Sequence, residues 1–340
     1  MAPRLNQIGF LPQARKVFAL AVPQSGPLSD FDIVRDDGIV VLSGTLSPDR
    51  RDLSAVTGEF VAQGDFTRLS RPGRYRVRAG GALSHPFVVG DGIYRPLLRD
   101  AARCFDLIRA NAVIDDPLTG IKIAAGHAGD AHIAIDGRDR DLTGGWYNAG
   151  DFGKYTHMAA MSVSHMLRLY ELRPQTASLG LDMAPLYPGL PDVLQLARWG
   201  LEWLLKMQNE DGGVLHKVDS QPILTWGKLP ADDPAPRKAM APSTIDAGVF
   251  TGVMGHASRA WPEPAFAARC RKAAEASWVW LKAHRNVPHD DAYYRDPDPI
   301  QGPSGRHAKW RPPTASTTIR WCYPISAPCR SSGAHRRCWA

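Results

Sequence analysis

One segment in the middle of the chain combines an acidic side chain with aromatic residues and glycines. It reads Thr-Gly-Gly-Trp-Tyr-Asn-Ala-Gly-Asp-Phe over residues 143–152. Its glycines let the backbone turn closely around a ligand, and Trp146 and Tyr147 offer flat faces of the kind that stack on sugar rings. Asp151 is expected to open a helix, whose partial positive charge at the N-terminus favours an ionised carboxylate. Such a carboxylate is suited to act as a general base that activates water.

The same residues also allow a purely structural interpretation. Asp151 would then only cap the helix, and Trp146 and Tyr147 would fill the core. The loop residues alone leave both interpretations open. His157 and His165 follow among methionines on the same predicted helix. We interpret these two as partly buried structural histidines.

Residues 1 to about 90 have the pattern of short strands at regular spacing. Asp-Asp-Gly at 36–38 and Arg-Pro-Gly at 71–73 are turn signals. Within Arg74–Arg78 the arginines alternate with apolar residues, which is the period of a sheet with one face in water. We therefore expect a small β-sandwich. Its predicted strands are Lys16–Val22, Phe31–Arg35, Val40–Gly44, Arg74–Arg78 and Phe87–Val89.

After residue 92 the apolar period changes from two to about 3.6 residues, which predicts helices joined by long loops rich in Gly and Pro. No strands are expected between them, so the second part is predicted to be all-α with its chemistry on the loops. Ser243, three residues before Asp246, is the expected N-cap of the fourth helix. Five helices are predicted. The first follows Pro96 and continues as far as Ala112, and the second begins near Asp151. The other three cover residues 191–207, Ser243 to Trp261, and 264–284.

The segment from Asp141 to Tyr155 strongly resembles the active-site loop of family 9 glycoside hydrolases, the inverting cellulase family. Further similarities follow in the same order over about residues 4–298. The resemblance implies a multi-domain chain, with an immunoglobulin-like all-β sandwich at 1–92 and part of an all-α (α/α)6 barrel at 93–298. The supporting segments are 5–12 (LNQIGFLP), 202–208 (EWLLKMQ), 211–218 (DGGVLHKV) and 241–244 (APST).

The resemblance also implies roles for individual residues. Two Asp residues of the family loop hold the attacking water, and the second of them, the base, corresponds to Asp151. The first is Asn148 here, which keeps a hydrogen-bonding group but removes a charge. The family's general acid is a distant Glu on a late segment, and no position of this chain matches it. The predicted catalytic residues are therefore Asp151 and Asn148, and the predicted substrate-binding residues are Trp146, Tyr147, His127 and His216. For His127 and His216 a structural role as packed loop residues stays open as the alternative.

No metal and no cofactor are expected. Some relatives bind zinc through two Cys and two His, but the counterparts of the Cys are Ala110 and Gly126 here, and only His127 is retained. One remaining ligand cannot form a closed tetrahedral site. The acidic pair Asp232 and Asp233 lies in a Pro-rich loop and is interpreted as a solvated turn rather than a calcium site.

The charge distribution argues against a nucleic-acid partner. The net charge is +7, but residues 299–340 contain seven basic and no acidic residues, so the 34 basic residues before them balance all 34 acidic ones. No run of residues is long and apolar enough for a membrane span, and the N-terminus has no apolar signal segment. We expect a monomer whose partner is a β-linked polysaccharide or oligosaccharide, cytoplasmic as written although the family is mostly secreted.

Residues 299–340 fit neither domain. They hold six Pro, three Trp and three Cys, and show neither the strand nor the helix period. The expectation is a basic tail of non-native character, arising where the chain is truncated or its reading frame is lost after about residue 298.

The function expected from these features is inverting hydrolysis of β-1,4-glucan, as by a cellulase or endoglucanase. Two alternatives stay open at this point. One is an exo-β-glucosaminidase or cellodextrinase of the same family. The other is an inactive carbohydrate-binding fragment that lacks the catalytic acid.

Overall fold

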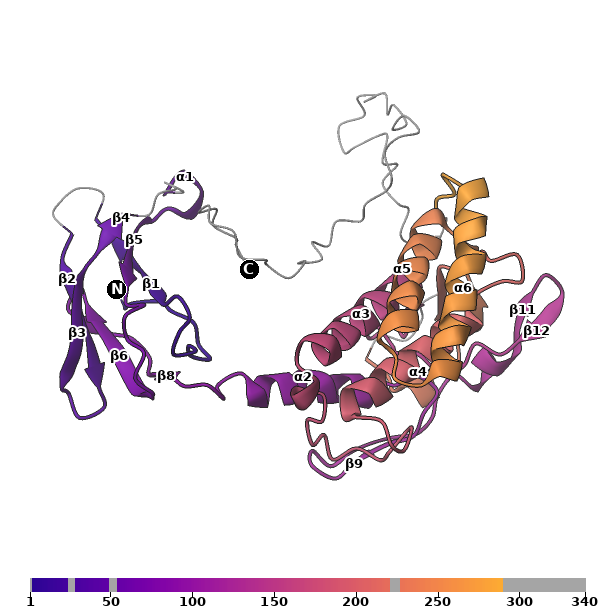
Figure 1. Ribbon diagram of the computed structural model, residues 1–340, viewed down its shortest axis with the longest axis horizontal. Coiled ribbons are helices and arrows are strands. Elements are labelled where there is room, and N and C mark those ends of the chain that lie inside the picture. The colour runs from indigo at the N-terminus through magenta and orange to yellow at the C-terminus, as the bar shows by residue number, and fades with distance from the viewer. Residues whose placement is uncertain (1, 24–27, 49–53, 221–226, 290–340) are drawn as a thin grey trace. The chain divides into compact units, whose positions relative to one another are not determined.

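The computed structural model describes residues 2–23, 28–48, 54–220 and 227–289. The tail predicted at 299–340 therefore lies outside the described residues. The described chain begins with a sheet-rich part and continues with a part in which helices dominate (Figure 1). None of the described helices is long and apolar enough to cross a membrane.

The sheet-rich part consists of two antiparallel sheets (Figure 1). One sheet has the order β1-β5-β4; the other has the order β3-β2-β6-β7, with β8 also paired to β6. The five strands predicted from the sequence are all present, whereas β5, which pairs along the whole of β1, was missed. The strands are β1 (Val17–Val22), β2 (Asp30–Arg35), β3 (Val40–Thr45), β4 (Ser47–Pro48), β5 (Phe60–Asp65), β6 (Gly73–Ala79), β7 (Ala82–Leu83) and β8 (Phe87–Val89), and α1 (Ser54–Thr57) precedes β5.

The core between these sheets is built from aromatic rings. Phe66 packs edge-on against Phe10 at 5.2 Å and lies 5.3 Å from Phe87. Phe18 and Phe31 form a second perpendicular pair at 5.0 Å. Such edge-to-face pairs add to the stabilisation from burial alone. The alternating burial along β6 confirms the prediction that one face of this strand is covered and the other exposed.

Five long helices make up the frame of the second part, and α3, α4, α5 and α6 pack around a common hydrophobic core (Figure 1). Ser243 caps α5 as predicted, since its hydroxyl accepts a hydrogen bond from the Asp246 backbone N–H. The first helix ends five residues earlier than predicted because Arg109 pairs with Trp146 in a β-bridge. The helices are α2 (Arg95–Leu107), α3 (Thr156–Leu172), α4 (Asp192–Lys206), α5 (Thr244–Ala260) and α6 (Pro264–Ala283).

The expectation that no strands occur among the helices is wrong. Three small antiparallel sheets lie in the connecting segments. Strands of two to four residues are too short for a period of two to stand out in the sequence. The sheets are β9 (Ile114–Asp116) with β10 (Ile121–Ile123), β11 (Ile133–Ile135) with β12 (Arg138–Arg140), and β13 (Lys154–Tyr155) with β14 (Lys217–Ser220) and β15 (Arg237–Ala239); the 3-10 turns are η1 (Ala128–His132), η2 (Pro174–Thr176) and η3 (Pro230–Asp232).

Gly200 on α4 lies directly against an indole ring of the core. A Cβ at this position would come within 2.4 Å of the Trp146 ring and 2.7 Å of the Val163 side chain. Neither neighbour can retreat, because both are buried in the core that α3 and α4 share. The absence of a side chain at 200 therefore allows Trp146 to pack flush with the helix.

We predict that Gly200→Ala lowers the free energy of unfolding by about 1–3 kcal/mol, because overpacking a core forces its neighbours out of place. Gly248→Ala on α5 is the matched control, since no atom lies within 4 Å of a Cβ there. This control should gain about 0.5–1 kcal/mol from helix propensity. Urea denaturation followed by circular dichroism measures both. Equal stability of the two variants would contradict the close packing described here.

Candidate active site

The sheet β13-β14-β15 follows the Gly-Gly-Trp segment identified in the sequence, since its first strand begins at Lys154. Lys154 pairs with Val218 and Tyr155 with Lys217, and Val218 pairs in turn with Ala239. Three stretches that are far apart in sequence thus meet in one sheet. This sheet determines where the side chains that follow the loop point.

Asp151 does not open a helix, so the predicted effect of a helix N-terminus on its carboxyl group is wrong. Helix α3 begins only at Thr156. Phe152 has a φ of 59°, in the left-handed region, which interrupts any helix at that point. The chain then continues as β13 before it turns into α3. The helix dipole therefore does not act on Asp151 from the adjoining residue.

The ammonium group of Lys154 is fully buried beneath the loop and forms four contacts there. It donates hydrogen bonds to the backbone carbonyls of Leu142, at 2.7 Å, and Gly144, at 3.1 Å. It also donates to Asn111 Oδ1 at 3.1 Å and pairs with Asp130 Oδ2 at 2.7 Å. A buried cation is tolerated only when its hydrogen bonds and charge are matched in this way. Sequence reasoning missed Lys154, although it lies within the motif.

A second cation, from Arg237, also pairs with Asp130. Arg237 on β15 donates to Asp130 Oδ1 at 2.9 Å, so the carboxylate receives a cation on each oxygen. Burial acts to raise the pKa of Asp130, but Lys154 and Arg237 together hold it below its usual value. Burial lowers the pKa of Lys154 to about 8, although Asp130 opposes this shift. The cluster joins η1, β13 and β15.

Asp151 is buried, with 6% of its surface exposed, and the Gly153 N–H lies 3.4 Å from its Oδ1 atom. A second carboxylate, Asp219 on β14, lies on another side of Gly153: a Cβ there would be 3.4 Å from Asp219 Oδ1. Lys217 donates to Asp219 Oδ2 at 2.7 Å. Burial raises the pKa of Asp219, and the charge of Asp151 raises it further, whereas Lys217 lowers it. Sequence reasoning missed Asp219, which carries no motif signal of its own.

His127 and Tyr147, both predicted to bind substrate, are in direct contact. His127 Nδ1 is 2.7 Å from the Tyr147 hydroxyl, and His127 Nε2 is 3.0 Å from Asp233 Oδ2. Ser220 Oγ also donates to Asp233 at 2.7 Å. The prediction of a solvated turn is therefore wrong for Asp233, whose side chain is buried, while Asp232 is exposed as predicted.

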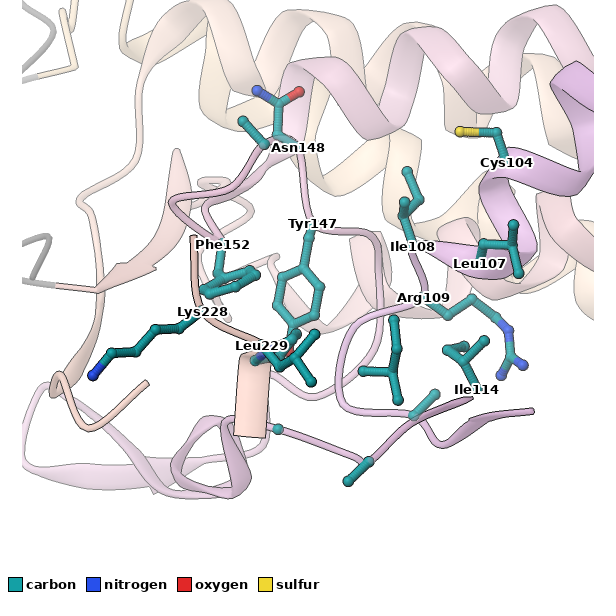
Figure 2. A pocket seen from close by; sticks show the side chains of 16 residues that line it. Cys104, Leu107, Ile108, Arg109, Ile114, Tyr147, Asn148, Phe152, Lys228 and Leu229 are labelled. Atoms are coloured by element: carbon teal, nitrogen blue, oxygen red, sulfur yellow. The ribbon is translucent and has the colours of Figure 1, made fainter. Parts of the chain in front are cut away.

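A cavity of about 340 Å³ lies beside this pair (Figure 2). Tyr147 and Phe152 form one wall, and Ile108 and Leu229 are among the apolar side chains on the other walls. Asn148 belongs to its rim and is exposed to solvent. Asp151 is not among the lining residues, so the cavity adjoins the loop without containing the predicted base.

The two positions considered for zinc have no room for a ligand of that kind. Ala110 is fully buried in a small cluster with Tyr147 and Phe152. At Gly126 a Cβ would lie 2.3 Å from the backbone of Pro230, so a larger side chain requires the segment around Pro230 to move. His127 directs its two ring nitrogens to Tyr147 and Asp233 instead.

The remaining predicted residues lie apart from the His127 pair. Trp146 is a core residue, whose ring packs edge-on against Phe105 at 5.2 Å. His216, which directly precedes β14, is buried. Its Nδ1 atom is 2.7 Å from Oδ2 of Asp246 in α5. Of the two predicted structural histidines, His157 is partly buried as expected, whereas His165 is exposed.

Comparison with known proteins gives one family match in the sheet-rich part of the chain and another in the helical part. Residues 94–303 match the model of glycosyl hydrolase family 9, and residues 3–84 match that of the cellulase N-terminal ig-like domain. An immunoglobulin-like domain followed by a helical glycoside hydrolase domain is the class of protein that these matches define. The chain belongs to glycosyl hydrolase family 9.

Individual relatives cover most of the chain. Endoglucanase C of Cellulomonas fimi is 32% identical over 83% of this chain and 28% of its own length. A metagenome-derived family 9 endoglucanase of known structure is 35% identical with a TM-score of 0.72, over 84% of this chain and 55% of that one. AaCel9A, solved in complex with a cellobiose-like isofagomine, is 29% identical with a TM-score of 0.74, over 87% and 56%. The chain thus spans about half the length of the two solved relatives and less than a third of the length of Endoglucanase C.

We predict that Lys154→Met lowers the free energy of unfolding by about 3–5 kcal/mol, because it removes one of the two cations of the buried Asp130 and the Lys154 hydrogen bonds to two loop carbonyls. Lys122→Met is the control, since Lys122 pairs with Asp115 on the surface, where 75% of its side chain is exposed. An exposed pair of this kind contributes about 1 kcal/mol or less. Urea unfolding of both variants provides the test. A difference below about 1 kcal/mol between them would refute the structural role of Lys154.

Proposed function

We propose that this chain supplies the water-activating half of an inverting glycoside hydrolase that acts on β-1,4-glucan. The observation that carries the proposal is the buried Asp151 carboxylate, which lies within the family match and in the loop that resembles the family's active-site segment. The names of the relatives support the substrate class, since they include endoglucanases and a complex with a cellobiose-like ligand.

In this proposal Asp151 is the general base and Asn148 positions the water through its amide oxygen. Asn148 lacks the charge of the first Asp of the family loop. Asp219 replaces part of this charge, since it provides a second carboxylate close to Asp151. The Lys217 ammonium beside Asp219 keeps the negative charge of the pair tolerable in a buried place. Trp146 supports the loop from the core.

Tyr147 and His127 are proposed to form one wall of the sugar site, and His216, which is buried and bonded to Asp246, is not assigned to it. Burial raises the pKa of the Tyr147 hydroxyl to about 12, so this group stays protonated and can donate a hydrogen bond. Burial also lowers the pKa of His127, which favours the neutral ring. Neutral donors and acceptors next to an aromatic face suit an uncharged sugar.

The general acid is proposed to come from the half of the family domain that this chain does not span. An inverting pair of carboxyl groups lies about 6.5–9.5 Å apart, with room for water between them. The chain should therefore be tested alone and as a chimera, with residues 1–298 joined to the remaining half of AaCel9A.

The test is release of reducing sugar from carboxymethylcellulose, cello-oligosaccharides and chitosan oligomers. We expect the chimera to hydrolyse the two glucans, and the chain alone to be slower by at least about 10²- to 10⁴-fold, the contribution of a positioned acid. Preference for chitosan oligomers would instead favour a glucosaminidase. Binding of cello-oligosaccharides by the chimera without hydrolysis would refute the catalytic proposal.

We predict that Asp151→Asn in the chimera lowers kcat by about 10²- to 10⁴-fold, because an amide cannot accept the proton of the attacking water. Asn148→Asp should preserve the fold and raise kcat severalfold, since the added charge makes Asp151 a stronger base. Asp139→Asn, an exposed site on β12, is the control and should leave kcat unchanged. Turnover of one soluble β-1,4-glucan decides, and activity that survives in a folded Asp151→Asn variant would show that the base is another residue.

A further inference from the structure

Two histidines and an aspartate from three separate segments converge on one point. His157 lies at the start of α3, His216 precedes β14, and Asp246 lies in the first turn of α5. One potential metal-ligating atom from each lies within 4.8 Å of the others. This is the one such group of three or more ligands within the described ranges.

The individual contacts are close to those of a metal centre. His157 Nδ1 is 3.3 Å from Asp246 Oδ1, and His216 Nδ1 is 2.7 Å from Asp246 Oδ2. Zinc bonds to nitrogen and oxygen measure about 2.0–2.2 Å, so tetrahedral ligands lie about 3.3 Å from one another. The His157 contact already has this separation. The shorter His216 contact is a hydrogen bond to the other oxygen, Oδ2, so binding one ion requires the carboxylate to turn and the His216 nitrogen to move away from it.

The surroundings hold these ligands in place. Ser243 Oγ donates to Asp246 Oδ2 at 2.5 Å while it caps the same helix, which orients the carboxylate. The rings of His157 and His216 are stacked 5.6 Å apart, and Tyr155 packs edge-on against both. Outer contacts that orient ligands in this way are typical of metal sites.

Charge and access also suit a cation. Burial acts to raise the pKa of Asp246, but the hydrogen bonds from the two histidines hold it below its usual value. The side chains of Asp246 and His216 are almost fully buried, whereas 31% of His157 is exposed. The His157 side is therefore the one from which an ion can enter.

We propose that His157, His216 and Asp246 bind one divalent transition-metal ion, Zn²⁺ by preference, with a water molecule as fourth ligand. Two imidazoles and a carboxylate are a ligand set that zinc uses when one position stays open. The ion joins α3, the segment before β14 and α5, and so stabilises the folded chain. This site is distinct from the Ala110 and Gly126 positions, and the proposal does not depend on glycan hydrolysis.

The test is zinc binding to the metal-free full chain, measured by isothermal titration calorimetry and by the zinc-induced rise in Tm. Cys104, Cys322, Cys329 and Cys338 are replaced by Ser throughout, because cysteine thiolates bind zinc themselves. We expect one zinc ion per chain and a Tm that rises with zinc concentration. A parent protein that binds no zinc at about 100 µM would overturn the proposal.

Two variants with a matched control test the assignment of the ligands. His157→Ala and Asp246→Asn should each weaken zinc binding by about 100-fold or more and abolish the rise in Tm. His165→Ala removes an exposed histidine from the same helix and should bind zinc as the parent does. Circular dichroism verifies that each variant is folded. Equal zinc affinity of folded His157→Ala and His165→Ala would show that the ion binds elsewhere and would refute the site.

Discussion

The buried ammonium group of Lys154 is the constraint on which the candidate site depends. A cation without water must find acceptors and an opposite charge within the protein. Lys154 finds them in the carbonyls of Leu142 and Gly144 and in Asp130, all of which lie in or before the Gly-Gly-Trp loop. The contacts that satisfy this one charge thus hold the backbone of the loop that carries Asp151.

Helix α4 holds the same loop from the opposite side, through the indole N–H groups of two tryptophans. Trp199 donates to the Gly145 carbonyl at 2.7 Å, and Trp203 donates to that of Leu142 at 3.2 Å. Gly145 has a φ of 75° and would place a Cβ within 2.6 Å of the Trp203 ring, so glycine is required there. The loop is clamped between a helix and a small sheet, which keeps its backbone rigid around the carboxylate.

The sequence predicted the helices and the main strands because long apolar stripes and turn residues are local signals. It also located the loop, whose motif is local too. It did not reveal Lys154, Asp219 or Asp233 as site residues, since their partners are distant in sequence and a lone charged residue most often lies in water. The start of α3 was misplaced for a related reason: the left-handed Phe152 leaves no mark on the apolar pattern.

The ion pair between Asp130 and Arg237 spans 107 residues of chain. At ordinary rates of translation, about 5–20 s pass between the synthesis of these two residues. During that interval the nascent chain carries the Gly-Gly-Trp loop and Lys154 without β15, so Asp130 has only one of its two cations. The buried ion-pair cluster beneath the loop can therefore be completed only after Arg237 has been synthesised.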